Sequence, residues 1–227
     1  MSEGIKGFGT LTSLQKEFME ILAGMPDKDQ FYLAGGTALS EYYLGHRLSF
    51  DLDYFTGTEN LILPISYQIE SACQNKGLSL KVIRRFATFV ELLVENERES
   101  LKIDLALDSP YRFESPVLSN EGIYINDYSD LRVDKLLAYF GRAEPRDAVD
   151  LYFLLQKESP ELLLEQAAQK DTGFDPYWFA IALNRSENFP NEIERWPVKM
   201  LKPFDPQNLK QVFLDWAIKL MDKTMKK

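Results

Sequence analysis

Hydrophobic residues recur along this chain in two different rhythms. Near the start, Leu14, Phe18, Ile21 and Leu22 follow the three-to-four-residue spacing of an amphipathic helix. Elsewhere, short apolar runs and two-residue alternation indicate strands. The expected strands are Phe31–Ala34, Asp51–Phe55, Leu78–Arg85, Thr88–Glu95 and Ser100–Leu107.

The strand rhythm stops near Ser129, and only helical spacing follows. Several of these later segments open with proline, which is well tolerated in the first turn of a helix. The expected helices are Leu11–Leu22, Thr37–Leu44, Pro64–Lys76, Asp130–Phe140, Pro145–Lys157, Pro160–Gln169, Pro176–Leu183 and Pro206–Met221.

This order of elements predicts an α/β (α+β) fold, in which a mixed sheet with flanking helices precedes a helical half. We place the boundary near Asn126, which gives an α/β domain of residues 1–126 and a helical domain of residues 127–227. Ligands often bind in a cleft between two such halves, so the helical domain is expected to close the active-site cleft.

Composition is that of an ordinary globular protein, with 45% hydrophobic and 13% aromatic residues among 227. No apolar run approaches the roughly 18 residues that span a bilayer, and the N-terminus lacks the pattern of a secretory signal. Cys73 is the single cysteine, which excludes an internal disulfide framework and a cysteine-rich zinc site. We expect a cytoplasmic protein that does not associate with membranes.

The formal net charge is −9, which disfavours a broad electrostatic footprint for nucleic acid. It leaves room for a local basic cluster, for which Lys81, Arg84 and Arg85 are the candidates.

Three aspartates carry the clearest chemical signal. Asp51 and Asp53 are two residues apart, so on a strand they share one face, about 6.6 Å apart. An isolated pair of this kind is most often a solvated edge. Asp104, however, lies within "LKIDLAL", where a carboxylate is costly unless it is exposed beside a partner such as Lys102 or binds a metal. Together the three acids favour a site for Mg²⁺ or Mn²⁺, which prefer oxygen ligands.

Gly35 and Gly36 end a strand and lead directly into a helix that begins at Thr37. Such a turn offers backbone N–H groups to an anion, and the absence of Cβ atoms lets a phosphate approach. The alternative is an ordinary tight turn. A phosphate cradle followed by a metal-binding pair would position a nucleoside triphosphate.

The order of these motifs resembles the nucleotidyltransferase superfamily. The stretch "GGTALSEYYLGHRLSFDLDYF" is similar to the AbiEii/AbiGii toxin family in particular, and "DLRVDKLLAYFGRAEPRDAVDLYFLL" is similar to later motifs of that family. The resemblance covers roughly Phe31 to Leu155 and implies a nucleotidyltransferase-like fold.

The resemblance also implies roles for individual residues. Gly35, Gly36 and Thr37 become the phosphate-contacting turn, with Arg47 as a further nucleotide contact. Asp51 and Asp53 become metal ligands, and Asp104 a third ligand or the base for the acceptor hydroxyl. The catalytic and nucleotide-binding roles in the later motifs fall to Lys135, Asp147 and Asp150.

Each residue of the later motifs also has a purely structural interpretation. Lys135 could be a solvated helical lysine, and Asp147 could be a structural cap, because acids favour the first turn of a helix. Of the two acids, Asp150 is the stronger candidate for a functional role. Arg146 stands where lysine is more usual in the family. We interpret His46, which follows Gly45 at a helix end, as structural rather than as a general base.

The implied activity is metal-dependent transfer of a nucleoside monophosphate from a nucleoside triphosphate to an acceptor hydroxyl. The family implies the toxin of a toxin–antitoxin system with a separate antitoxin, acting on RNA, including tRNA, or on protein. The alternatives are a non-catalytic nucleotide-binding regulatory module and a phosphotransferase that moves the γ-phosphate.

Overall fold

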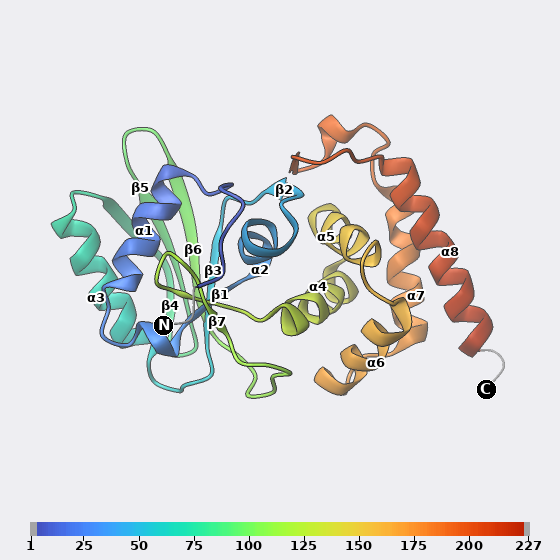
Figure 1. The fold of residues 1–227 in the computed structure, drawn as a ribbon, viewed down its shortest axis with the longest axis horizontal. Coiled ribbons are helices and arrows are strands. Elements are labelled where there is room, and N and C mark those ends of the chain that lie inside the picture. Colours follow the sequence, from blue (N-terminus) through green and yellow to red (C-terminus); the bar gives the residue numbers. More distant parts are fainter. Residues whose placement is uncertain (1–3, 225–227) are drawn as a thin grey trace. The chain divides into compact units, whose positions relative to one another are not determined.

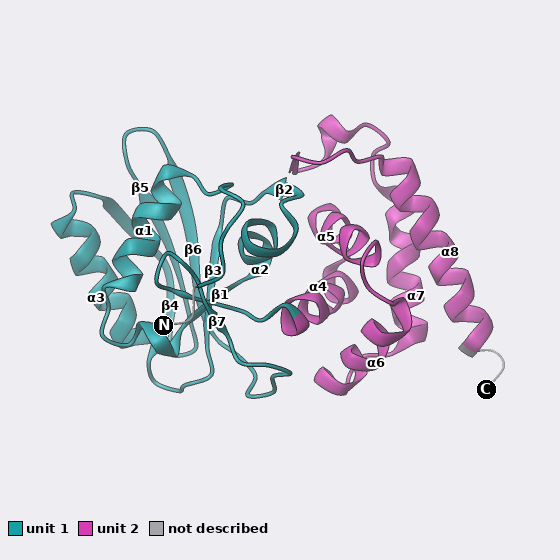
Figure 2. Ribbon diagram, in the orientation of Figure 1, with its two compact units in different colours: residues 1–128 teal, residues 129–227 magenta. Residues whose placement is uncertain are grey.

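The computed structural model describes residues 4–224. The chain divides into two compact units, residues 1–128 and residues 129–227 (Figure 2). Each unit has its own buried core, and each is described by itself below.

The first unit is built around a mixed seven-stranded sheet, which confirms the predicted fold class (Figure 1). The strand order is β4-β5-β6-β3-β1-β8-β7. Strand β3 runs parallel to β6 and antiparallel to β1, while β1 runs parallel to β8. The bounds are β1 Tyr32–Ala34, β3 Leu52–Thr56, β4 Ser79–Phe86, β5 Phe89–Glu95, β6 Ser100–Leu107, β7 Val117–Leu118 and β8 Tyr124–Ile125.

One face of this sheet is apolar and covered by helices α1 (Ser13–Ala23) and α3 (Ile62–Asn75) (Figure 1). Tyr54 and Ile103 on this face are fully buried, and the ring of Phe18 from α1 lies 6.2 Å from that of Tyr54. Because side chains alternate along a strand, Asp53 and Asp104 point to the opposite face. We call that opposite side the carboxylate face.

The segment after β1 differs from the expected helix Thr37–Leu44. Helix α2 begins two residues earlier, at Gly35, and ends at Ala38. A wider π-helical turn, Leu39–Leu44, then continues it to Gly45, whose left-handed backbone (φ 56°) ends the segment as predicted. A single helical rhythm in the sequence does not distinguish an α turn from a π turn.

Buried Glu41 lies in this π turn and ties it to the start of the chain. Its carboxylate accepts hydrogen bonds from the backbone N–H groups of Gly9 (2.8 Å) and Thr10 (2.6 Å). A fully buried carboxylate needs such partners, so residues 9 and 10 help to stabilise the segment that follows the Gly-Gly turn.

The remaining differences from the expected elements are short. Asp51 precedes β3 instead of opening it. The two-residue strands β2 (Arg47–Leu48), β7, β8 and β9 (Lys199–Met200) were not predicted, because two residues are too few to show an alternating pattern.

The second unit is predominantly helical. Aromatic rings form its core: Tyr139 contacts Phe213 and Phe179 contacts Trp216, with ring centres 5.2 and 5.1 Å apart. No helix among the described residues is long and apolar enough to cross a membrane. The bounds are α4 Tyr128–Arg142, α5 Pro145–Leu155, α6 Pro160–Lys170, α7 Pro176–Asn184 and α8 Pro206–Thr224.

Candidate active site

The Gly-Gly turn is shaped around two side chains of the first unit. Gly35 has a left-handed backbone (φ 65°), and a Cβ atom there would lie 2.0 Å from Oδ2 of Asp53. A Cβ at Gly36 would lie 2.5 Å from Nη2 of Arg47. The missing side chains therefore make room for an acid and a guanidinium, and this places the turn, Asp53 and Arg47 at one site.

Thr37 and Arg47 are both held by local hydrogen bonds. The buried Thr37 hydroxyl donates to the backbone carbonyl of Asp51, which joins α2 to the approach of β3. Arg47 is also buried and donates through Nη1 to the carbonyl of Leu48 at 3.0 Å. His46, next to it, is fully buried.

The register of the sheet brings the acids of two distant sequence motifs together. Asp53 and Asp104 are directly paired residues on the parallel strands β3 and β6, and Ala34 at the end of β1 pairs with Asp53 on the other side. Paired residues of neighbouring strands point to the same face. Asp51 lies two residues before Asp53, and its charge acts on Asp104.

The two oxygens of the Asp104 carboxylate have different surroundings. Oδ2 accepts an ion pair from Nζ of Lys102 at 2.8 Å, but Oδ1 is buried without a hydrogen-bond partner. Burial raises the pKa of Asp104; Lys102 opposes that rise, and the charges of Glu91 and Asp51 add to it. A buried carboxylate oxygen without a partner is a suitable ligand for a cation.

The acids fit a divalent metal in chemistry but do not form a closed ligand set. Among residues 4–224, no three His, Cys, Asp or Glu side chains are grouped as a ready metal site. The oxygen donors of Asp51, Asp53 and Asp104 suit Mg²⁺ or Mn²⁺.

Glu91 is a further acid of this site that the sequence analysis missed. It pairs directly with Asp104 across β5 and β6, and with Arg84 across β4 and β5. Its carboxylate lies 3.1 Å from Nε of Arg84 and 3.7 Å from Nζ of Lys102. The alternation in "FVELLVE" does place Glu91 opposite the buried valines and leucine, but the partner strand cannot be read from that alternation.

The suggested basic cluster does not exist as a unit. Arg84 and Arg85 are consecutive residues of β4 and pair with Glu91 and Val90, so their side chains point to opposite faces of the sheet. Arg84 lies on the carboxylate face, whereas Arg85 pairs with Glu70 of α3 and lies over the ring of Tyr67, 4.2 Å from its centre.

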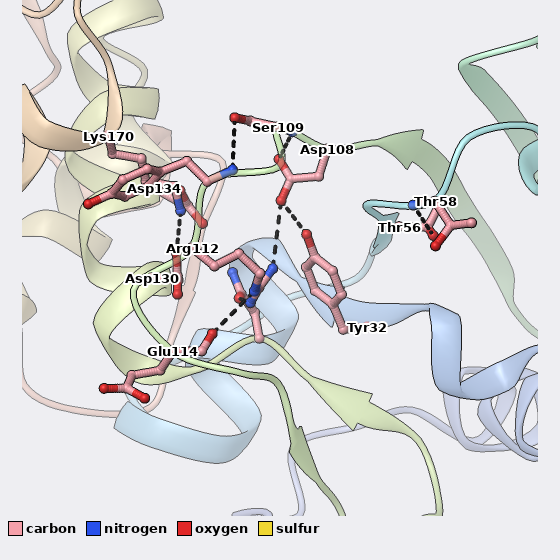
Figure 3. Close-up of polar contacts among 12 residues, drawn as sticks. Tyr32, Thr56, Thr58, Asp108, Ser109, Arg112, Glu114, Asp130, Asp134 and Lys170 are labelled. Atoms are coloured by element: carbon pink, nitrogen blue, oxygen red, sulfur yellow. Dashed lines mark hydrogen bonds and ion pairs between the residues drawn. The ribbon is translucent and has the colours of Figure 1, made fainter.

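Beside β1, the segment that follows β6 forms a polar network that is visible in Figure 3. The hydroxyl of Tyr32 donates to Asp108, and Arg112 lies over the Tyr32 ring, 4.2 Å from its centre. Arg112 also donates to the side chain of Asn126 and, through Nε, to the carbonyl of Glu114. This network fixes the segment after β6 against β1.

In the second unit, the residues of the later motifs are buried and paired. Nζ of Lys135 on α4 lies 2.8 Å from Oδ2 of Asp150 on α5. The interpretation of Lys135 as a solvated surface lysine is wrong, because its side chain is only 7% exposed. Asp147 accepts two hydrogen bonds from Arg142, one of them at 2.8 Å.

Comparison with known proteins identifies the family. The family model described as nucleotidyl transferase AbiEii toxin, type IV toxin–antitoxin system, matches residues 18–216. The chain belongs to the AbiEii nucleotidyltransferase toxin family. The sequence resemblance was therefore correct, and the match extends well beyond the segment that carried it.

Relatives of this AbiEii-family protein include an uncharacterized protein of Aquifex aeolicus, aq_aa25. It is 32% identical over 163 residues, which cover 69% of this chain and 73% of that protein.

Two solved structures show the same fold. A candidate nucleotidyltransferase from Helicobacter pylori superposes with a TM-score of 0.60 at 22% identity, covering 95% of this chain and 98% of that one. The nucleotidyltransferase toxin MenT4 of Mycobacterium tuberculosis superposes with a TM-score of 0.59 at 19% identity, covering 92% and 82%.

Proposed function

We propose that this AbiEii-family protein transfers a nucleoside monophosphate from a nucleoside triphosphate to an acceptor hydroxyl, with a divalent cation. The observation that supports this most directly is the in-register pair of Asp53 and Asp104 beside the Gly35 turn, with a buried Asp104 oxygen that has no hydrogen-bond partner. This arrangement suits a cation and a triphosphate better than it suits a purely structural ion pair.

In the proposed mechanism, Asp51, Asp53 and Asp104 would hold Mg²⁺ or Mn²⁺. A divalent cation held by these acids would supply positive charge to the triphosphate and to the leaving pyrophosphate. The backbone of Gly35, Gly36 and Thr37 and the guanidinium of Arg47 bind phosphate oxygens of the donor.

Asp104 accepts the proton of the acceptor hydroxyl. The acceptor oxygen then forms a bond to the α-phosphorus, and the bond between that phosphorus and the bridging oxygen of the β-phosphate breaks. The proposal follows the family resemblance in assigning Lys135 to the triphosphate. Asp150 then holds the Lys135 ammonium in a defined position, and Asp147 with Arg142 stabilises the start of α5.

The family description also supports a biological setting. We propose that the protein is the toxin of a type IV system with a separate antitoxin, and that its acceptor is RNA, with tRNA as one candidate, or protein.

The reaction can be tested with nucleoside triphosphates labelled at the α- or the γ-phosphate, Mg²⁺ and a pool of cellular RNA and protein. We expect the α-label in the acceptor and one pyrophosphate released for each transfer. Asp53→Asn and Asp104→Asn should each lower the rate roughly a hundredfold or more, because several kcal/mol of transition-state charge stabilisation are lost.

Glu95→Gln is the matched control, because Glu95 is an exposed acid on the same face of β5. Its rate should equal that of the wild type. Transfer of the γ-label would instead identify a phosphotransferase, and nucleotide binding without any transfer would identify a regulatory module. Either result contradicts the proposal.

A further inference from the structure

A row of aromatic residues crosses the carboxylate face next to the acids. In the register of the sheet, Phe55 of β3 pairs with Ala106 of β6, Ala106 pairs with Phe89 of β5, and Phe89 pairs with Phe86 of β4. The row therefore reads Phe55–Ala106–Phe89–Phe86 across four neighbouring strands. We call this row of three phenylalanines and one alanine the aromatic row.

The aromatic row runs parallel to the row of charged residues. Each member lies two residues along its own strand from Asp53, Asp104, Glu91 or Arg84. Two residues of strand span about 6.6 Å, so the backbone of each member of the row lies about that far along its strand from an acid or from Arg84.

The rings are accessible to different degrees. Phe86 is 60% exposed at the last position of β4, where it pairs with Phe89 at the hairpin turn, while Phe55 and Phe89 are half-buried. A phenylalanine this exposed on a sheet contributes little to the core of its own unit. An exposed aromatic group in line with two others indicates a binding surface.

Ala106 gives the row a gap of suitable size. Phe55 and Phe89 are two strands apart, or about 9.6 Å, and only a methyl group lies between them. A planar base about 3.4 Å thick can lie between or upon such rings. Phe55 is held in place by the stack of its ring on Tyr32 (centres 6.3 Å apart), and Tyr32 is in turn fixed by Asp108 and Arg112 (Figure 3).

Positive charge lies beyond the acids, towards the edge strand. On β4 the same face carries Arg84, whose side chain is 63% exposed although it pairs with Glu91. It also carries exposed Lys81, which pairs with Leu93 on the side of the charged row away from Phe86. The aromatic row and these two cations together match a ligand made of flat rings joined by phosphates. Single-stranded nucleic acid is such a ligand, and sheet aromatics bind its bases by stacking.

The position of the row relative to the donor site indicates which substrate it serves. The proposed donor turn is at β1 and α2, on one side of Asp104, whereas Phe89, Phe86 and Arg84 lie on its other side. The acceptor hydroxyl must reach Asp104 from the side that the donor does not occupy.

We propose that the aromatic row, with Lys81 and Arg84, binds the last bases of a single-stranded nucleic acid acceptor and directs its terminal hydroxyl to Asp104. This inference rests on the proposed function, and it selects single-stranded nucleic acid over protein as the acceptor. It also explains how a chain of net charge −9 could hold a polyanion through local contacts.

Binding can be measured without any turnover, by fluorescence anisotropy of a short labelled single-stranded RNA with Mg²⁺ and no nucleotide. Phe86→Ala and Phe89→Ala should each raise the Kd about tenfold, as expected for the loss of one stacked base. The same RNA annealed into a duplex should bind more weakly and be insensitive to both substitutions, because its bases are already stacked.

Tyr67→Ala is the matched control. Tyr67 is a comparably exposed aromatic residue (56%), but it lies on α3, which covers the opposite face. Its Kd should equal that of the wild type. Circular dichroism of all variants verifies the fold, and Phe86→Leu offers a second variant that keeps apolar volume but not the ring.

The possible results separate this inference from the proposed function. If wild-type protein fails to bind single-stranded RNA, or if the phenylalanine variants bind as tightly as Tyr67→Ala, the aromatic row is not the acceptor site. Transfer of an α-labelled nucleotide to protein in the same preparation would then leave the proposed function intact. Loss of RNA affinity in the variants of a preparation that transfers nothing would contradict only the proposed function.

Discussion

Asp104 shows how much of this site depends on the surroundings of a single residue. Its identity and its place in an apolar strand are plain from the sequence. Its Lys102 partner is two residues away and was foreseen as an alternative. The buried Oδ1 and the neighbouring charge of Glu91, however, depend on how three strands pair, and neither could be seen in the sequence.

Gly35 gives a prediction at the same scale. Gly35→Ala should lower the free energy of unfolding by about 1–3 kcal/mol, because alanine is strained at φ 65° and its Cβ would overlap Asp53. It should also abolish nucleotidyl transfer, because Asp53 must move. Urea unfolding and the labelled-nucleotide assay measure the two effects.

Gly57→Ala is its control, because Gly57 has no heavy atom within 4 Å of an added Cβ and no left-handed backbone. It should change stability by less than about 0.5 kcal/mol. Equal stabilities of the two alanine variants would show that the Gly35 turn can adapt, contrary to our interpretation.

At the scale of secondary-structure elements, helices α4 and α5 are joined by a buried ion pair. Lys135 and Asp150 form a buried ion pair between these helices. Removal of one partner leaves a buried charge, so Lys135→Met and Asp150→Leu should each lower stability by about 3–5 kcal/mol. The double variant should lose much less than the sum, because it leaves neither charge unpaired.

The activities of the single and double variants show whether the Lys135–Asp150 pair serves catalysis or only stability. The double variant should recover stability but not nucleotidyl transfer, since the lysine proposed to contact the triphosphate is still missing. A double variant that is both stable and active would show that the pair serves only the fold. Thermal unfolding and the labelled-nucleotide assay decide between these outcomes.

The elements also show which parts of the fold could be predicted. The long helices and the strands β4, β5 and β6 were recognised because each carries at least two periods of its pattern. The π turn after α2 and the two-residue strands were missed because they leave no such pattern. The aromatic row and the position of Glu91 were missed for another reason: both depend on strand pairing between residues far apart in the sequence.

At the scale of the whole molecule, the net charge limits how a nucleic acid can bind. The chain has 35 acidic and 26 basic residues, so its net negative charge repels a long polyanion. Only a small number of phosphates can then be neutralised by the protein.

This charge balance predicts a weak dependence of RNA binding on salt. If Lys81 and Arg84 supply the phosphate contacts, log Kd should rise with log[NaCl] with a slope of about 1 to 2. Lys81→Met should lower that slope by about one unit while leaving the effect of Phe86→Ala unchanged. Titrations of the labelled RNA at several salt concentrations measure both, and a steep slope would indicate an extended basic surface instead.

The bulge in β4 has a consequence for how related sequences should be aligned. Residue 83 is an extra residue in its strand, so Arg84, Arg85 and Phe86 after it have exchanged sides relative to an unbroken alternation. In a relative that lacks this extra residue, the one-residue gap belongs at position 83. An alignment that places the gap after Arg84 would equate Arg84, beside the acids, with a residue that points to the face covered by α3.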